Sequence, residues 1–84
     1  MDMELRDTMD GMLSDDYVER FRAEFSQLHI RAEKLGKMLR DYEDGTLRFT
    51  PKCGAELLYR QLSTMREYEL VLARRATIEN ISLK

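Results

Sequence analysis

Apolar residues recur along residues 16–43 with the period of an α-helix. Successive apolar positions alternate in steps of three and four residues. They are Val18, Phe21, Phe25, Leu28, Ala32, Leu35, Leu39 and Tyr42. This heptad spacing places the side chains along one seam of a helix. Asp16 and Glu19 have the spacing of a capping box, and Gly45 is suited to end a helix in the left-handed conformation. The pattern therefore predicts a helix over residues 16–43.

A second helix is predicted over residues 51–80, with a stripe that is only half apolar. The apolar lane of this stripe consists of Leu58, Met65 and Leu72. The alternate positions form a polar lane that consists of Gln61, Tyr68 and Arg75. Thr50-Pro51 favours a helix start, because threonine caps the first turn and proline fits the first helical position.

Residues 44–50 form a turn between the two predicted helices. Helices that are joined by so short a connection lie antiparallel and side by side. We therefore predict an all-α fold in which residues 15–84 form an antiparallel two-helix hairpin of the coiled-coil type. Residues 1–14 precede it as a separate N-terminal arm that is rich in methionine and acidic residues.

A chain of 84 residues is short for a self-sufficient hydrophobic core. Its second helix also has apolar residues outside the seam, which are Leu70, Val71, Ile78, Ile81 and Leu83. They leave the last third of that helix apolar on nearly every side, and such a helix is usually buried all round. We therefore expect two copies to dimerise into a helical bundle, or the hairpin to dock on a larger protein.

The arm is acidic, whereas the rest of the chain is mildly basic. Six acidic residues against one arginine give residues 1–16 a net charge of -5, so the remainder carries +3 within a total of -2. Charges of both signs alternate along the predicted helices without a basic stripe, which argues against direct nucleic-acid binding. No apolar run is long enough for a membrane span, and the acidic start does not resemble a signal peptide. We expect a cytoplasmic protein.

Residues that serve catalysis or metal binding are few. The chain has one cysteine and one histidine, and no set of residues combines a nucleophile, a base and an orienting group. Cys53 falls in the predicted first turn of the second helix, but no base lies near it in the sequence. We therefore predict no catalytic, cofactor-binding or metal-binding residues, and a protein that is not an enzyme.

The polar lane of Gln61, Tyr68 and Arg75 has two interpretations. Polar residues in a helix seam often fix the register and the number of associating helices. Alternatively, the three side chains line a groove for a polar ligand or partner. The candidate acidic partners for Arg75 lie at the start of the first helix and are Asp15, Asp16 and Glu19.

A protein partner is predicted to meet the arm together with the apolar end of the second helix. Flexible methionine-rich faces suit adaptable binding surfaces. The partner-binding candidates are Asp7, Met9, Asp10 and Met12 in the arm, and Leu70, Ile78 and Ile81 in the second helix.

The stripe L-x-x-Q-x-x-x-M-x-x-Y-x-x-x-L-x-x-R begins at Leu58, and the first helix reads YVERFRAEFSQL and then RAEKLGKML. Over about residues 17–78, the chain resembles a family of small helical-hairpin proteins of bacteriophages and prophages that is named after a crAssphage gene product. The resemblance implies a phage accessory protein in the bacterial cytoplasm. Small accessory proteins of that kind are often inhibitors of host defence.

Three functions remain open from the sequence. The first is stoichiometric inhibition of a bacterial host protein, such as a CRISPR or other defence effector, in the manner of an anti-CRISPR protein. The second is an oligomeric sponge that sequesters a nucleotide immune signal, with Gln61, Tyr68 and Arg75 as phosphate and base contacts. The third is a structural or assembly role.

Overall fold

The computed structural model describes residues 3–83, and its regular elements are helical. They are a 3-10 helix η1 (Leu5–Thr8) and the α-helices α1 (Met9–Met12), α2 (Tyr17–Glu43) and α3 (Ala55–Glu79). No strand occurs in this part of the chain. The molecule is elongated and measures 42 × 24 × 22 Å. The end residues 1, 2 and 84 of the predicted arm and hairpin lie outside the described residues.

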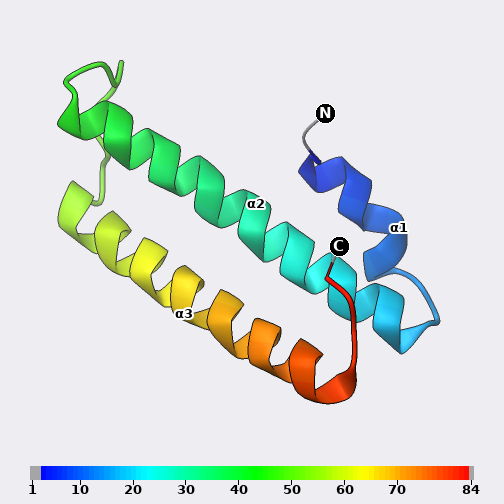
Figure 1. The fold of residues 1–84 in the computed structure, drawn as a ribbon. Coiled ribbons are helices and arrows are strands. Elements are labelled where there is room, and N and C mark those ends of the chain that lie inside the picture. Colours follow the sequence, from blue (N-terminus) through cyan, green and yellow to red (C-terminus); the bar gives the residue numbers. More distant parts are fainter. Residues whose placement is uncertain (1–2, 84) are drawn as a thin grey trace.

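The fold has three α-helices where the sequence predicted two. The long helices α2 and α3 run antiparallel and side by side, while the arm folds into η1 and α1 against α2 (Figure 1). The four residues of α1 are too few to display a heptad pattern, and so short a helix depends on tertiary packing. The fold is therefore all-α, with a third helix beside the long pair.

α2 spans Tyr17–Glu43, within one residue of the predicted helix. Asp16 caps its start, because its Oδ1 atom accepts a hydrogen bond from the backbone N–H of Val18 at 3.0 Å. Gly45 has a φ of 75° and follows the end of the helix in the left-handed conformation. Both boundary signals are local in the sequence.

α3 begins at Ala55, later than the predicted start at residue 51. Its N-cap is Gly54, which has a φ of 83° and donates its backbone N–H to the carbonyl oxygen of Pro51 at 3.1 Å. The left-handed conformation of Gly54 is incompatible with a helix that runs on from Pro51. Cys53 consequently lies in the turn and not in the first turn of the helix.

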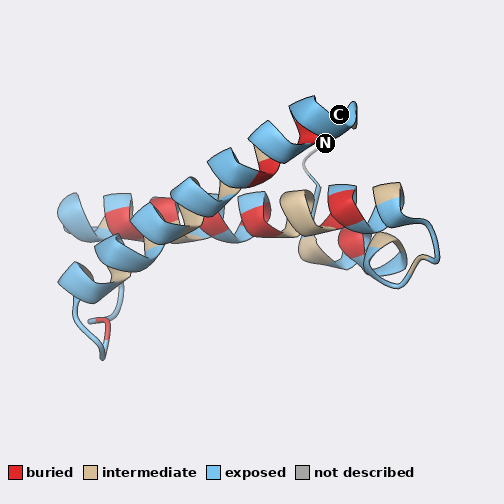
Figure 2. Ribbon diagram, turned by 90° about the horizontal axis from the view of Figure 1, so that it is seen from below, coloured by how far each residue is buried: buried red, intermediate tan, exposed pale blue. Residues whose placement is uncertain are grey.

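The seam between α2 and α3 holds the hydrophobic core. The buried cluster consists of Phe21, Leu28, Leu72 and Ala76, and the partly buried residues around it are Phe25, Met65, Ile81 and Leu83. Ala32 and Leu39 are buried further along the seam. Of the remaining predicted seam residues, Val18, Leu35 and Leu58 are half-buried, whereas Tyr42 is exposed. Figure 2 shows these buried positions spaced along both long helices between exposed ones.

α2 has a second buried face, which packs against the arm. Ala23 and Ile30 are buried on this side, and Gly11 of α1 lies directly on Ala23. A Cβ atom at Gly11 would lie 2.8 Å from the Cβ of Ala23, so the close approach requires glycine. The heptad pattern predicted one buried face because two apolar positions on the opposite side make too weak a signal.

The residues after α3 turn back onto the core. Asn80 has a φ of 58° and ends the helix, and the backbone N–H of Ile81 donates to the carbonyl oxygen of Ala76 at 2.8 Å. Arg22 of α2 fastens this segment, since its Nε donates to the carbonyl oxygen of Ser82 at 2.6 Å. Within residues 3–83, no helix combines the length and apolar character that crossing a membrane requires.

Candidate ligand-binding site

A network of charged and phenolic side chains lies at the open end of the α2–α3 pair, the end away from the connecting turn. Arg75 Nη2 donates to the hydroxyl oxygen of Tyr17 at 3.0 Å, and Tyr17 donates to Glu79 Oε1 at 2.7 Å. Arg75 Nε also donates to Glu79 Oε2 at 3.4 Å. The network therefore links the start of α2 to the end of α3.

Arg75 is held in place by an aromatic ring as well. Its Cζ atom lies 4.9 Å from the ring centroid of Phe21, which is a cation–π arrangement. Phe21 itself is only 3% exposed. The hydrogen bond to Tyr17 raises the pKa of Arg75 and favours its charged form. Within residues 3–83, Arg75 Nη1 makes no hydrogen bond, so the guanidinium keeps donors for another group.

Within the described residues, Arg75 contacts none of the acidic residues that the sequence suggested as its partners. Asp16 caps α2, and Glu19 accepts a hydrogen bond from the hydroxyl of Ser14. Arg75 uses Tyr17 and Glu79 in their place. The prediction put the right ends of the two helices together but selected the wrong partners.

The other two members of the polar lane make different contacts. The Tyr68 hydroxyl donates to the carboxylate of Glu24 on α2, and this bond raises the pKa of Tyr68. Gln61 Nε2 contacts the sulfur of Met65 within α3, at 3.8 Å. Tyr68 and Arg75 are therefore tied to α2, whereas Gln61 interacts within its own helix.

A pocket of about 270 Å³ adjoins this network. Its lining residues are Met12, Tyr17, Arg20, Phe21, Glu24 and Arg75. Arg20 and Arg75 outweigh the carboxylate of Glu24 and leave the lining with a net positive charge, and the half-exposed ring of Tyr17 supplies an aromatic face. Guanidinium groups bind phosphate and carboxylate strongly, and aromatic faces accept a stacked base. The pocket therefore suits an anionic group that is attached to a planar ring.

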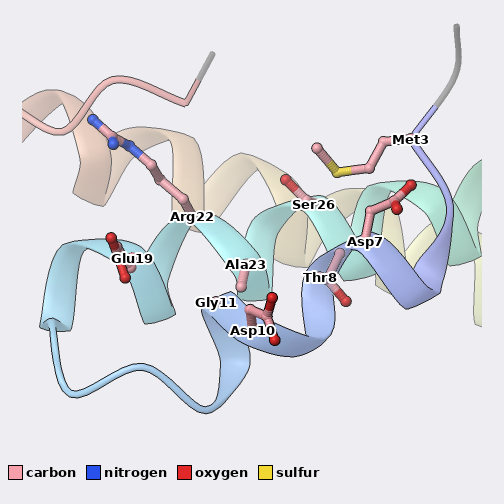
Figure 3. Close-up of a pocket in the computed structure, with 9 residues that line it drawn as sticks. All are labelled: Met3, Asp7, Thr8, Asp10, Gly11, Glu19, Arg22, Ala23 and Ser26. Atoms are coloured by element: carbon pink, nitrogen blue, oxygen red, sulfur yellow. The ribbon is translucent and has the colours of Figure 1, made fainter.

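A second pocket of about 330 Å³ lies between the arm and α2, and Figure 3 shows its lining. Asp7, Asp10 and Glu19 give it an acidic character. Arg22 extends away from these carboxylates, toward the C-terminal residues, where it bonds the carbonyl oxygen of Ser82 (Figure 3). An acidic lining repels anions, so the pocket at Arg75 is the better candidate for phosphate.

A further cluster of polar side chains connects α2 and α3 near the middle of the two helices. Arg66 contacts Glu69 at 2.8 Å and Glu33 at 3.5 Å, and His29 Nδ1 lies 3.0 Å from Glu69 Oε2. These polar side chains contact one another across α2 and α3. Among residues 3–83, no three His, Cys, Asp or Glu side chains gather in a way that would hold a metal ion.

The predicted partner-binding residues lie on the arm, on α3 and just after α3. Those of the arm belong to η1 and α1, which pack on α2 and on no other described element, and they are Asp7, Met9, Asp10 and Met12. Leu70 and Ile78 on α3 are 66% and 79% exposed, although the sequence suggested burial at this end. Ile81 packs against the core of its own chain. That both groups meet one partner stays a prediction, and Met12 of the arm lines the same pocket as Arg75 of α3.

The sequence analysis did not select Tyr17, Arg20, Glu24 or Glu79. Tyr17 had a usable signal, because it lies one helical turn before Phe21, beside the seam. The two carboxylates gave no signal in the sequence, because their partners are distant along the chain. Glu79 bonds Tyr17, 62 positions away, and Glu24 bonds Tyr68, 44 positions away. Such pairs emerge only when α2 and α3 are placed together.

The fold and the site define a small all-α protein with a pocket whose charge and aromatic lining suit the binding of an anion. A comparison with protein families matches residues 15–78 to the family described as Sequestin. The chain belongs to the Sequestin family. The matched range contains Tyr17, Tyr68 and Arg75 and begins after the arm. No curated protein and no solved structure shows significant similarity to the chain.

Proposed function

We propose that the protein acts as a stoichiometric sponge and not as an enzyme. Its ligand is a small molecule that combines phosphate with an aromatic base, of the kind found in nucleotide immune signals. The observation that carries the proposal is the position of Arg75. Its guanidinium lies over Phe21, is oriented by Tyr17 and Glu79, and lines the pocket with an Nη1 group that makes no hydrogen bond within residues 3–83.

The family name supports a sequestering role, since the family is described as Sequestin. A sequestering protein must bind its ligand without converting it, so it needs donors, charge and stacking surface and no reactive group. Arg75 and Arg20 provide the charge, and Tyr17 provides the stacking surface.

The size of the pocket limits what one copy can enclose. Pockets for whole small-molecule ligands measure roughly 300–1,000 Å³, and this one measures about 270 Å³. One copy therefore accommodates a phosphate with part of its nucleoside. A larger signal, such as a cyclic dinucleotide, would extend onto a second copy, which agrees with the oligomeric assembly that the sequence suggests.

Titration calorimetry with cyclic mononucleotides and cyclic dinucleotides tests the proposal. We expect saturable binding at a fixed ratio and recovery of the unchanged nucleotide after denaturation. Arg75→Gln should weaken binding roughly tenfold or more, because hydrogen bonds to charged groups contribute about 1.5–3 kcal/mol. The control variant is Arg66→Gln, which removes a paired arginine of the same helix and should leave affinity unchanged. No binding of any nucleotide, or equal losses in both variants, would overturn the sponge.

A second candidate function is inhibition of a bacterial host protein, and the exposed apolar side chains of the arm favour it. Met9 is 59% exposed and Leu13 is 81% exposed, beside the carboxylate of Asp10. A Met9→Ser, Leu13→Ser double variant should lose capture of a purified defence effector while its nucleotide binding persists. If effector inhibition is undiminished, the arm does not make that contact.

Both functions suit an accessory protein of a phage or prophage that acts in the bacterial cytoplasm against host defence. The resemblance to phage helical-hairpin proteins supports this setting. A protein that bound neither nucleotides nor a host protein would instead have the structural or assembly role.

A further inference from the structure

An exposed apolar stripe runs along α3, roughly 100° around the helix from the seam that packs on α2. Leu57, Val71 and Ile78 are 54%, 51% and 79% exposed, and Thr64 occupies the remaining position. The four residues are spaced seven apart, which places them in one line along the helix. This outer stripe is separate from the seam of Leu58, Met65 and Leu72 that packs on α2.

A line of charged residues flanks the outer stripe on one side. Arg60, Glu67 and Arg74 are also seven residues apart, and all three are exposed. Within the described part of the chain, none of the three side chains has an ion-pair or hydrogen-bond partner. The order positive, negative, positive is the same when the helix is traversed in either direction.

We infer that the part of the outer stripe from Thr64 to Ile78 is the interface between two antiparallel copies of this chain, in which Glu67 of each copy pairs with Arg74 of the other. A two-fold axis perpendicular to the helices brings the same flanking line of both copies together in opposite directions. Val71 then lies at the axis against its own counterpart, and Ile78 packs on Thr64 of the second copy. Heptad spacing of this kind, with charges beside it, is how helices specify a helical partner.

Charge selects this arrangement over the alternatives. A parallel pair would place the line of Arg60, Glu67 and Arg74 beside the other copy's polar lane and so bring Arg74 close to Arg75. An antiparallel pair centred between Thr64 and Val71 would set Glu67 against its own counterpart. Like charges across such an interface destabilise it, whereas the pairing about Val71 matches two Glu67–Arg74 contacts.

The arm leaves this face free, because η1 and α1 pack on α2. The inference does not depend on the proposed ligand, since assembly is measured without one. The two-fold axis would also place the Tyr68 and Arg75 edges of both copies on the same side of the dimer.

Light scattering and sedimentation of the full chain test the interface. We expect the wild type to have twice the 10.0 kDa mass of one chain. Val71→Glu and Glu67→Arg should each weaken dimerisation at least tenfold while circular dichroism retains the helical signal. The double variant Glu67→Arg, Arg74→Glu should restore the dimer, because the charges are exchanged and still match. Arg31→Glu, the same type of charge change at an exposed site of α2, is the control and should remain dimeric. A monomeric wild type, or a dimer that Val71→Glu and Glu67→Arg leave intact, would overturn the inference.

Discussion

The two ends of the α2–α3 pair differ in how much apolar surface they bury. At the open end, the buried side chains of Phe21 and Leu72 are joined by Ile81 from the residues that follow α3. At the turn end, Phe49 and Leu57 are 57% and 54% exposed. The buried cluster around Leu72 therefore lies toward the end farthest from the connection between the helices.

The polar groups of the two ends differ as well. At the open end, Arg75 adds positive charge to the contact between Tyr17 and Glu79. At the turn end, the Tyr59 hydroxyl donates to Glu43 in a pair that joins the two helices. Because Phe21 belongs to the core cluster and also supports Arg75, the open end combines that cluster with the candidate site. A ligand there would meet a preorganised surface.

Truncating a leucine to alanine should give the largest difference in stability between the two ends. Leu72 is 1% exposed, so Leu72→Ala should lower the free energy of unfolding by about 3 kcal/mol. Leu58 near the turn is half-buried, and Leu58→Ala should cost about half as much, because less contact area is lost. Urea unfolding followed by circular dichroism measures both values. Equal losses would show that the two ends are packed equally.

A smaller effect is expected at the contact between the arm and the open end. Gly11→Ala places a Cβ 2.8 Å from the Cβ of Ala23 and should cost about 1 kcal/mol or more, because the arm must shift. Gly36→Ala is the matched control within α2, where the nearest atoms lie at 3.5 and 3.8 Å. It should stabilise the helix by up to about 1 kcal/mol. Hydrogen exchange should become faster in residues 5–12 of the Gly11 variant alone, and unchanged exchange would contradict the packing of the arm.

The smallest effect concerns the tyrosines of the two ends. The bond to Glu43 raises the pKa of Tyr59 to about 12, while at Tyr17 the raising effect of Glu79 is opposed by Arg75. An unfolded tyrosine has a pKa of about 10. The stabilisation from the neutral Tyr59 phenol is therefore complete below about pH 10 and is lost as the pH rises toward about 12.

Ultraviolet titration of the folded protein measures this difference. Glu43→Gln should bring the phenolate transition of Tyr59 down toward pH 10. Glu56→Gln removes an exposed carboxylate without a tyrosine contact and should leave the titration unchanged. An identical titration in the wild type and the Glu43 variant would exclude the Tyr59–Glu43 bond.

Local signals account for the part of the fold that the sequence predicted. The heptad steps and the cap at Asp16 located α2, and the short turn implied that α2 and α3 are antiparallel. The start of α3 was misplaced because Thr50-Pro51 looks like a helix start, while the left-handed conformation of Gly54 depends on the whole turn. Whether the arm folds was left open by the sequence, because a helix of four residues relies on tertiary contact, here with Ala23.

The candidate site was only partly predictable for a related reason. Tyr68 and Arg75 were selected because polar residues interrupt an apolar stripe, which is visible in one helix alone. Their partners Glu24 and Tyr17 lie on the other helix, and the pairing requires the register of α2 against α3. Sequence patterns identify a face of one helix, whereas a pocket needs two.

The most direct test of the account is to map a bound cyclic nucleotide on the ¹⁵N-labelled protein by nuclear magnetic resonance. The central claim is that the ligand binds at the open end, beside Arg75. We predict chemical-shift changes concentrated in residues 17–24 and 68–79, with residues 44–54 of the turn end unaffected. Shift changes confined to the turn end, or no changes at a saturating nucleotide concentration, would contradict it.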